Sequence, residues 1–206
     1  MEDRQKSIVV GITGASGSIY GIKLVETLLQ MEYLVHLVIS NAGWRVIKEE
    51  LGWSTSDREE LLRDKFGSFP GTVVYHPVAD IGASIASGSF LTKGMIIMPC
   101  SMGTLSSIAN GTSDNLMARA ADVMLKEGRP LVLVPRETPL HAIHLENMLK
   151  LARLGVRIIP AMPAFYFGPK NIDDLVSFLV GKVLDNLGIE HALFTRWGDH
   201  NEQPGE

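Results

Sequence analysis

Short apolar runs alternate with amphipathic helical patterns along most of this chain. This alternation restricts the possible folds more than any other feature. Strands that alternate with helices form a parallel sheet through right-handed crossovers, with helices on both faces. The pattern therefore predicts an α/β protein whose ligands collect beyond the carboxyl ends of the strands. The apolar runs cover residues 7–13, 34–40, 73–76, 94–99, 130–135 and 156–160, and the helical patterns cover residues 18–30, 42–51, 57–65, 114–127, 140–154 and 172–187.

The composition fits one globular domain. The chain has 206 residues, of which 46% are hydrophobic and 20% charged, enough to bury a full core. We expect a single domain over residues 1–198 and a disordered tail over the polar residues 199–206. The formal net charge of -4 argues against a general nucleic-acid-binding protein, because such proteins usually present a basic surface to phosphates.

Cysteine content and the amino-terminal sequence indicate a cytoplasmic protein. Cys100 is the only cysteine, so no intramolecular disulfide can form, and a small buried hydrophobe is its simplest role. The first apolar run ends in glycine and is too short for a signal peptide or a membrane span. We therefore expect a reducing, cytoplasmic environment and no association with membranes.

A glycine-rich turn joins the first apolar run to the first helical pattern. Residues 11–21 read GITGASGSIYG. Glycines let the backbone approach an anion closely, and the first turn of the following helix offers unpaired N–H groups. This predicts a nucleotide phosphate cradle, although similar turns also serve only for tight packing.

Two common nucleotides fit this turn poorly. A dinucleotide site requires an acidic residue after the second strand, but that strand ends in Ser40-Asn41. An ATP-binding P-loop requires a lysine that the turn lacks. A mononucleotide such as FMN remains compatible.

Other expected strand ends carry hydroxyl, small or charged residues. Ser101, Gly103 and Thr104 follow one strand and open a helix, so they form either a second cradle or an ordinary helix cap. Asp114 is expected to cap the next helix. The small-residue loop 85–90 either covers a ligand or is a surface connection.

A basic and an acidic residue follow the strand at 130–135. The Arg136 guanidinium can form a paired contact with a phosphate. Unless a cation neutralises it, Glu137 beside such a phosphate is expected to hold a proton and to donate it to a leaving phosphate. The alternative is a surface ion pair of little consequence.

Three further groups have competing interpretations. His141, His144 and Glu146 could share a helix face, but no zinc-type ligand set completes them, so no metal is expected. Glu50 belongs either to a solvated helix face or to the ligand site. Lys126 ends a helix, where a cation is favourable in any case.

Several motifs together closely resemble the flavin prenyltransferase family, known as the UbiX family, which includes the small B subunits of phenolic-acid decarboxylase systems. They are TGASGSIYG at 13–21, PCSMGTL at 99–105, RAADVMLKEGRPLVLVPRETPLHAIHLENMLKL at 119–151, PAFY at 163–166, and Arg196-Trp197. The resemblance covers almost the entire chain in order.

The resemblance implies a three-layer αβα, Rossmann-like (flavodoxin-like) fold with a mostly parallel sheet. It implies an FMN-binding homododecamer that transfers a dimethylallyl group from dimethylallyl phosphate to N5 and C6 of reduced FMN without a metal. The product, prenylated FMN, would be the cofactor of a UbiD-type decarboxylase partner.

The resemblance also implies the roles of individual residues. Trp197 would lie near the prenyl group and steady its developing positive charge, while Ser16 and Glu50 relay protons and Glu137 assists the departure of phosphate. Lys182 stands where arginine occurs in several family members, so it keeps the charge but loses the planar fork. The FMN contacts would be Gly14, Ala15, Ser16, Ser40, Ser101, Met102, Gly103, Thr104 and Arg136, and the donor phosphate site, formed in part across a subunit boundary, would be Arg119, Lys126, Glu137, Tyr166 and Lys182.

Two other functions share the flavin cradle. A flavin-dependent decarboxylase of cysteine-containing peptides would carry the signature P-x-M-N-x-x-M-W, whereas residues 135–140 read PRETPL. A noncatalytic carrier that hands FMN to a decarboxylase would need no acidic residue at position 137.

Overall fold

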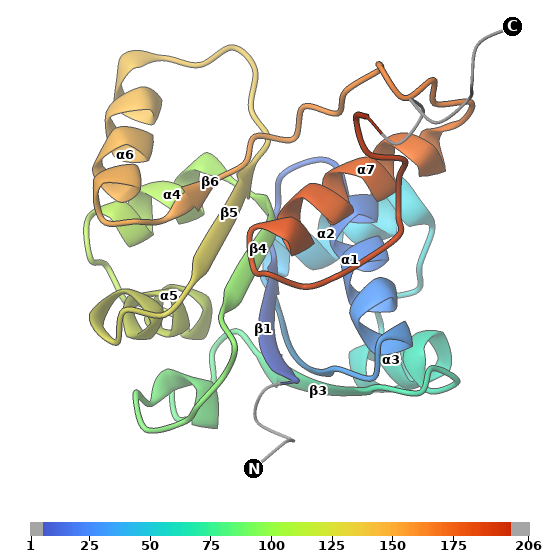
Figure 1. The fold of residues 1–206 in the computed structure, drawn as a ribbon. Helices are drawn as coiled ribbons and strands as arrows, with labels where there is room; N and C mark the ends of the chain where they lie inside the picture. The colour runs from blue at the N-terminus through green and yellow to red at the C-terminus, as the bar shows by residue number, and fades with distance from the viewer. Residues whose placement is uncertain (1–5, 199–206) are drawn as a thin grey trace, which may run out of the picture.

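The computed structural model describes residues 6–198, which form a parallel sheet between two layers of helices (Figure 1). The strand order is β3-β2-β1-β4-β5-β6, and every pairing among the described residues is parallel. The predicted α/β fold class is confirmed. The strands are β1 (Ser7–Ile12), β2 (Leu34–Ile39), β3 (Thr72–Pro77), β4 (Met95–Cys100), β5 (Leu131–Pro135) and β6 (Arg157–Ile158).

The chain reverses its direction of growth across the sheet between β1 and β4. Val9 of β1 pairs with His36 of β2 on one side and with Met95 of β4 on the other. From β1 the sheet extends to β2 and β3 in one direction and to β4, β5 and β6 in the other. In sheets of this order a crevice opens at the carboxyl ends of the two strands that flank the reversal, and ligands bind there.

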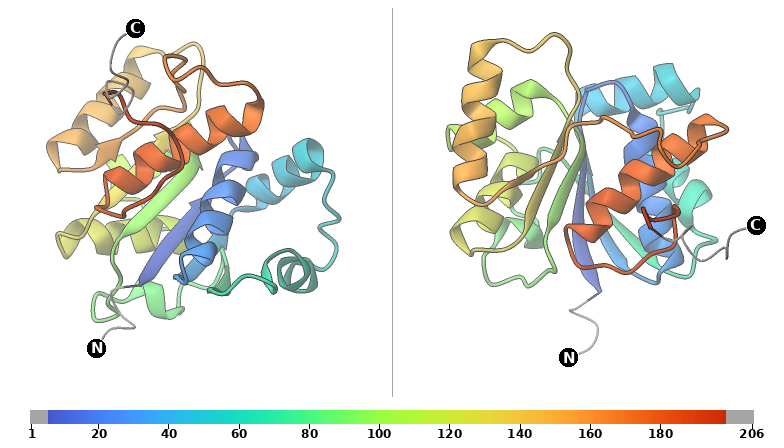
Figure 2. Two further views of the ribbon diagram at one scale, coloured as in Figure 1. Left: turned by 45° about the vertical axis from the view of Figure 1, so that its right-hand side comes forward. Right: turned by 45° about the horizontal axis from the view of Figure 1, so that its top comes forward.

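Helices cover both faces of the sheet, as the two turned views show (Figure 2). The helices α1, α2, α3 and α7 pack on one face, and α4, α5 and α6 pack on the other with the short 3₁₀ helix η2 (Ser84–Ala86). Neither α4 nor η2 was among the helical patterns predicted from the sequence, although a helix was expected to open at residues 101–104. The helices are α1 (Ser18–Gln30), α2 (Asn41–Leu51), α3 (Arg58–Phe66), α4 (Met102–Ala109), α5 (Leu116–Lys126), α6 (Ala142–Arg153) and α7 (Ile172–Asp185).

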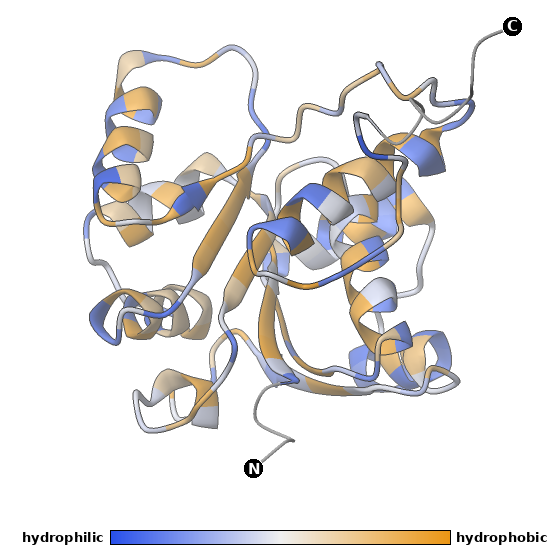
Figure 3. Cartoon of the chain, viewed as in Figure 1, coloured by the Kyte–Doolittle hydropathy of each residue, from blue (hydrophilic) through white to orange (hydrophobic). Residues whose placement is uncertain are grey.

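Alternation along the buried strands builds two cores. Ile8, Val10 and Ile12 of β1 face α1 and α7, whereas Val9 faces the α5 side. All four side chains are fully buried, and each such aliphatic contributes about 1.5–3 kcal/mol by leaving water. The central strands β1, β4 and β5 are accordingly mostly hydrophobic (Figure 3).

Helix starts follow ordinary capping chemistry, with one difference from expectation. The α5 cap is Asn115, whose side chain accepts a hydrogen bond from the N–H of Ala118. The prediction of Asp114 as the cap is wrong, because the Asp114 carboxylate instead accepts from the Asn115 side-chain amide at 2.9 Å. Asn115 has the extended backbone that a cap requires.

The expectations about membranes, metals, the carboxyl-terminal tail and the cellular location have different outcomes. Among residues 6–198, no helix is long and apolar enough to cross a membrane, and no group of three or more His, Cys, Asp or Glu side chains is arranged to hold a metal. The expected tail at 199–206 lies outside the described residues. The cytoplasmic location and the domain limits stay predictions.

Candidate active site

Thr13 joins the ends of the two strands that flank the reversal. Its hydroxyl donates to the carbonyl of Pro99 at 2.8 Å and accepts from the N–H of Ser101 at 2.7 Å. The side chain is buried, so these bonds are shielded from water. The turns after β1 and β4 are thus held side by side at the carboxyl edge of the sheet.

The turn after β1 requires glycine at two positions. A Cβ added to Gly14 would lie 2.5 Å from the Cβ of Ala42, at the start of α2. Gly17 has φ of 99°, in the left-handed region that side chains rarely adopt. The glycines therefore bring α1 and α2 together beside the turn.

The amino end of α1 holds a carboxylate. The N–H groups of Gly17 and Ser18 donate to Glu50 at 2.8–3.1 Å, and the Ser18 hydroxyl donates at 2.7 Å. The prediction that this helix start cradles a phosphate is therefore wrong for these two N–H groups. Glu50 thus points back to the turn after β1, and its part in the ligand site stays a prediction.

Glu50 is held in its ionised form. Burial alone would raise the pKa of its carboxyl group, but hydrogen bonds from the Ser16 and Ser18 side chains and from the Gly17 and Ser18 backbone outweigh it. The net pKa of Glu50 is lowered. Ser16 and Glu50, expected to act together, do lie together.

Two other helices begin at the same edge with serine caps. The Ser40 hydroxyl accepts from the N–H of Gly43 at 3.0 Å, at the start of α2. At the start of α4, the Ser101 hydroxyl accepts from the N–H of Thr104 and donates to its hydroxyl. Gly103 faces open space, since a Cβ there would meet no atom within 4 Å. The α4 start therefore leaves room for a ligand against its backbone.

Arg136 supplies an unsatisfied cation at this edge. It follows β5, and its backbone N–H donates to the carbonyl of Cys100 at 3.3 Å. Its side-chain Nε is buried without a hydrogen-bond partner. A buried guanidinium nitrogen without a partner is costly, and an anionic ligand would satisfy it. Glu137 beside it is exposed and accepts from the N–H of Thr138 at 3.0 Å.

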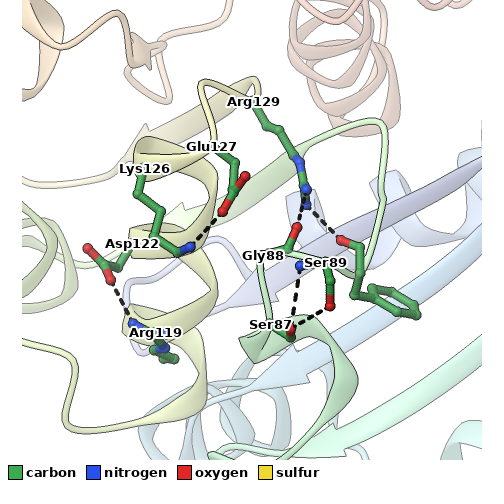
Figure 4. A network of polar contacts seen from close by, with 9 residues as sticks. Ser87, Gly88, Ser89, Arg119, Asp122, Lys126, Glu127 and Arg129 are labelled. Carbon is green, nitrogen blue, oxygen red and sulfur yellow. Dashed lines mark hydrogen bonds and ion pairs between the residues drawn. The ribbon is translucent and has the colours of Figure 1, made fainter.

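The basic residues of α5 lie in a different place. Arg119 pairs with Asp122 at 2.9 Å, and Lys126 pairs with Glu127 at 2.6 Å (Figure 4). Because α5 leads into the first residue of β5, Lys126 lies at the amino edge of the sheet. It is therefore remote from Arg136 of the same chain.

The loop at 87–90 lies against the end of α5 (Figure 4). The Arg129 guanidinium donates to the carbonyls of Gly88 and Phe90. The Ser87 and Ser89 hydroxyls are 2.9 Å apart. The loop thus places two hydroxyl groups beside the end of α5, and a ligand-covering role for it stays a prediction.

The remaining expected residues gather around α7. The Tyr166 and Trp197 rings meet edge to face at 5.3 Å, and both are exposed, Trp197 by 82%. Lys182 lies 3.8 Å from Asp185 on α7. The sequence predicted Tyr166 and Trp197 as site residues but not the segment that brings their rings together.

Comparison with known proteins identifies the family. The Flavoprotein family model matches residues 1–184. The chain is 60% identical to the flavin prenyltransferase UbiX of Alkalihalophilus pseudofirmus over 95% of its own length and 98% of that protein. It is 50% identical to the UbiX of Saccharolobus solfataricus over 95% of its length and 94% of that protein. The chain belongs to the flavin prenyltransferase family.

Solved structures of flavin prenyltransferases and their relatives share the fold. AnUbiX (PadA1), crystallised with FMN and dimethylallyl pyrophosphate, superposes with a TM-score of 0.86 at 42% identity, over 95% of this chain and 98% of that one. A dodecameric FMN-dependent UbiX-like decarboxylase from Escherichia coli O157:H7 superposes with a TM-score of 0.81 at 48% identity, over 90% and 96%. The peptidyl-cysteine decarboxylase EpiD, at 16% identity and a TM-score of 0.59, shares the fold alone.

In this flavin prenyltransferase, the expected site residues fall into three groups. The first group, at the carboxyl edge, contains most of the expected FMN contacts. The second is Arg119 and Lys126 on α5, and the third is Tyr166, Lys182 and Trp197 around α7. Within one chain Lys126 lies at the amino edge of the sheet and Arg136 at the carboxyl edge, and the sharing of the donor site between subunits stays a prediction.

Sequence reasoning missed two residues that organise the site. Thr13 was expected only as part of a motif. A threonine at the end of a buried strand could have indicated a hydroxyl that links that strand to its neighbour. Asp185 was not expected at all, because its partners Arg196 and His191 follow a chain reversal.

Proposed function

We propose that this chain catalyses the transfer of a dimethylallyl group from dimethylallyl phosphate to reduced FMN. The prenyl group forms bonds to N5 and C6, phosphate leaves, and the prenylated FMN serves a UbiD-type decarboxylase. One structural observation carries the proposal: the unpaired, buried Nε of Arg136 beside the open start of α4. Family membership and the FMN and dimethylallyl pyrophosphate bound by AnUbiX support it.

FMN is proposed to lie across the carboxyl ends of β1 and β4. Arg136 and the backbone at Gly103 fit a phosphate there, because the guanidinium nitrogen lacks a partner and no side chain fills the space. Thr13 fixes the two turns that border the flavin. The contacts would come from Gly14, Ala15, Ser16, Ser40, Ser101, Met102, Gly103, Thr104 and Arg136.

The donor phosphate is proposed to bind cations from neighbouring subunits. Arg119 and Lys126 would reach the flavin of another protomer, joined there by Tyr166, Lys182 and Glu137. Helix α6 supports an assembly, since Ile143, Leu145 and Leu149 on it are more than half exposed. A homododecamer, the state of the Escherichia coli relative, would cover such apolar side chains.

The chemistry follows from charge and position. Departure of phosphate breaks the allylic C–O bond, so charge builds on oxygens that the cations stabilise. Glu137 would give its proton to that phosphate, and the π face of Trp197 would steady the allylic positive charge. After N5 is alkylated, ring closure would need a proton added to the CH carbon of the prenyl C=C bond, so that its tertiary carbon can bond C6, and C6 would then release its own proton. Glu50, held ionised and bonded to Ser16, is suited to receive it.

The direct test mixes reduced FMN, dimethylallyl phosphate and purified protein without oxygen. Mass spectrometry should show FMN with an added C5 unit and an equal amount of free phosphate. A protein that binds FMN but leaves its mass unchanged would contradict the proposal.

Glu137→Gln separates an enzyme from a carrier. The substitution removes the proton donor but keeps the size of the side chain, so FMN binding should persist while prenylation falls by about two to four orders of magnitude. Glu49→Gln is the matched control, because Glu49 is an exposed glutamate on α2 that pairs with Arg45 at 2.9 Å. Full delivery of functional cofactor by Glu137→Gln would favour the carrier.

A further inference from the structure

The segment after α7 folds back onto that helix through one carboxylate. We call residues 189–198 the hook. Asp185, the last residue of α7, accepts from both terminal nitrogens of Arg196 at 2.8 and 3.1 Å and from Nε2 of His191 at 3.2 Å. Two side chains of the hook therefore converge on a single acidic group.

His191 is fixed in one tautomer by its two neighbours. Its Nδ1 accepts from the N–H of Leu193 at 3.2 Å, so the ring proton is on Nε2 and points at Asp185. The His191 side chain is fully buried. The His191 side of the contact is thus shielded from water.

Gly181 allows the hook to lie close to α7. A Cβ at this position would come within 2.6 Å of both the Phe194 and His191 rings. The Phe194 ring packs on Phe178 with centroids 4.8 Å apart. The hook therefore depends on a bare patch of helix backbone, one turn before Asp185.

The hook carries Trp197 to Tyr166. Trp197 is 82% exposed, so its own burial does not hold it in place. Tyr166 packs edge to face on both Trp197 and Phe178. Asp185 also lies 3.8 Å from Lys182. The same carboxylate thus contacts the hook and one of the cations proposed for the donor phosphate.

We propose that Asp185 is a positioning residue for the donor site, because its carboxylate fastens the hook to α7 and so holds Trp197 against Tyr166 beside Lys182. The part about the donor rests on the proposed function. The fastening itself does not, because it concerns the conformation of the free protein.

Hydrogen–deuterium exchange tests the fastening without any substrate. In Asp185→Asn the bidentate charged contact is lost, and the amides of the hook should exchange about tenfold faster. Asp173→Asn is the matched control, because Asp173 lies at the other end of α7 and pairs with Lys23 at 2.8 Å. The control should leave exchange of the hook unchanged.

Kinetics distinguish positioning from loss of structure. In this proposal the donor binds only subunits whose hook is fastened. A smaller fastened fraction therefore lowers the apparent affinity for the donor, whereas a saturating donor concentration restores the full rate. Asp185→Asn should therefore raise KM for dimethylallyl phosphate about tenfold and keep kcat within about twofold. A lower kcat with unchanged KM would mean that Asp185 is only structural, and would overturn the proposal.

Gly181→Ala provides a second variant that leaves the carboxylate in place. Alanine suits a helix better than glycine, so α7 should form, but the methyl group displaces Phe194 and His191. The variant should show the same faster exchange and the same rise in KM. Unchanged hook exchange in both variants would refute the fastening. If the variants exchange faster but the wild-type protein makes no prenylated FMN, the fastening stands and the proposed function is refuted instead.

Discussion

Lowering the pH from 7 to 5 should destabilise the folded chain by about 2 kcal/mol through one buried histidine pair. His36 on β2 and His76 on β3 lie with Nδ1 and Nε2 3.0 Å apart. They are 4% and 9% exposed, and the Phe90 ring covers His36 edge-on. Burial, and then the nearby His76, lower the pKa of His36 from 6.5 to about 4. Burial also lowers the pKa of His76, against the opposing charge of Asp80.

The sign and size follow from proton linkage. Between pH 6.5 and about 4 the unfolded chain binds a proton at His36 that the folded chain does not. Stability contributed by the neutral histidine is therefore complete above pH 6.5 and is lost as the pH falls. At 1.36 kcal/mol per pH unit the loss is about 2 kcal/mol at pH 5 and about 3 kcal/mol near pH 4.

Urea unfolding followed by circular dichroism at several pH values measures this loss, with protein concentration held constant because assembly contributes to stability. His36→Leu removes the titrating group and keeps an apolar side chain on the strand. Its free energy of unfolding should fall about 2 kcal/mol less than that of the wild type between pH 7 and 5. Equal losses in the two proteins would refute the account of the pair.

Three further predictions concern the site. Gly14→Ala should lower the free energy of unfolding by about 1–3 kcal/mol, because the new methyl group meets the Cβ of Ala42, and Ala42→Gly should restore part of that loss in urea unfolding. Glu50→Gln should cost about 1 kcal/mol at the start of α1 and slow prenylation, whereas Glu49→Gln should do neither; equal rates would exclude a role for the carboxylate. Lys182→Arg should lower KM for dimethylallyl phosphate, because the guanidinium fork binds phosphate through two hydrogen bonds; an unchanged or higher KM in steady-state kinetics would contradict this.

Much of the fold was predictable because its strands are continuous apolar runs. β1 and β2 lie within one residue of their expected bounds, since a strand buried on both faces leaves little ambiguity in the sequence. The carboxyl-edge residues Ser40, Ser101 and Arg136 were predictable for the same reason. Once the strand directions are known, the residues that follow each strand must meet at one edge.

Other features depend on contacts between distant segments. The Glu50 carboxylate fills the start of α1 from 33 positions away along the chain, and no local pattern reports that. The hook requires the chain to reverse after α7 through Gly188, which has φ of 62°. Lys126 shows the opposite case. A helix that returns from the carboxyl edge to the start of the next strand must end at the amino edge, so its distance from Arg136 follows from topology.

The central claim is that reduced FMN lies along the carboxyl edge with the donor phosphate pocket beside its N5. A crystal structure of the protein soaked without oxygen with reduced FMN and dimethylallyl phosphate tests it most directly. The account predicts the flavin phosphate on Arg136, the donor phosphate on Lys126 of a neighbouring protomer, and the allylic C1 within about 3.5 Å of N5. An unoccupied edge, or an alkene bound far from the isoalloxazine, would contradict it.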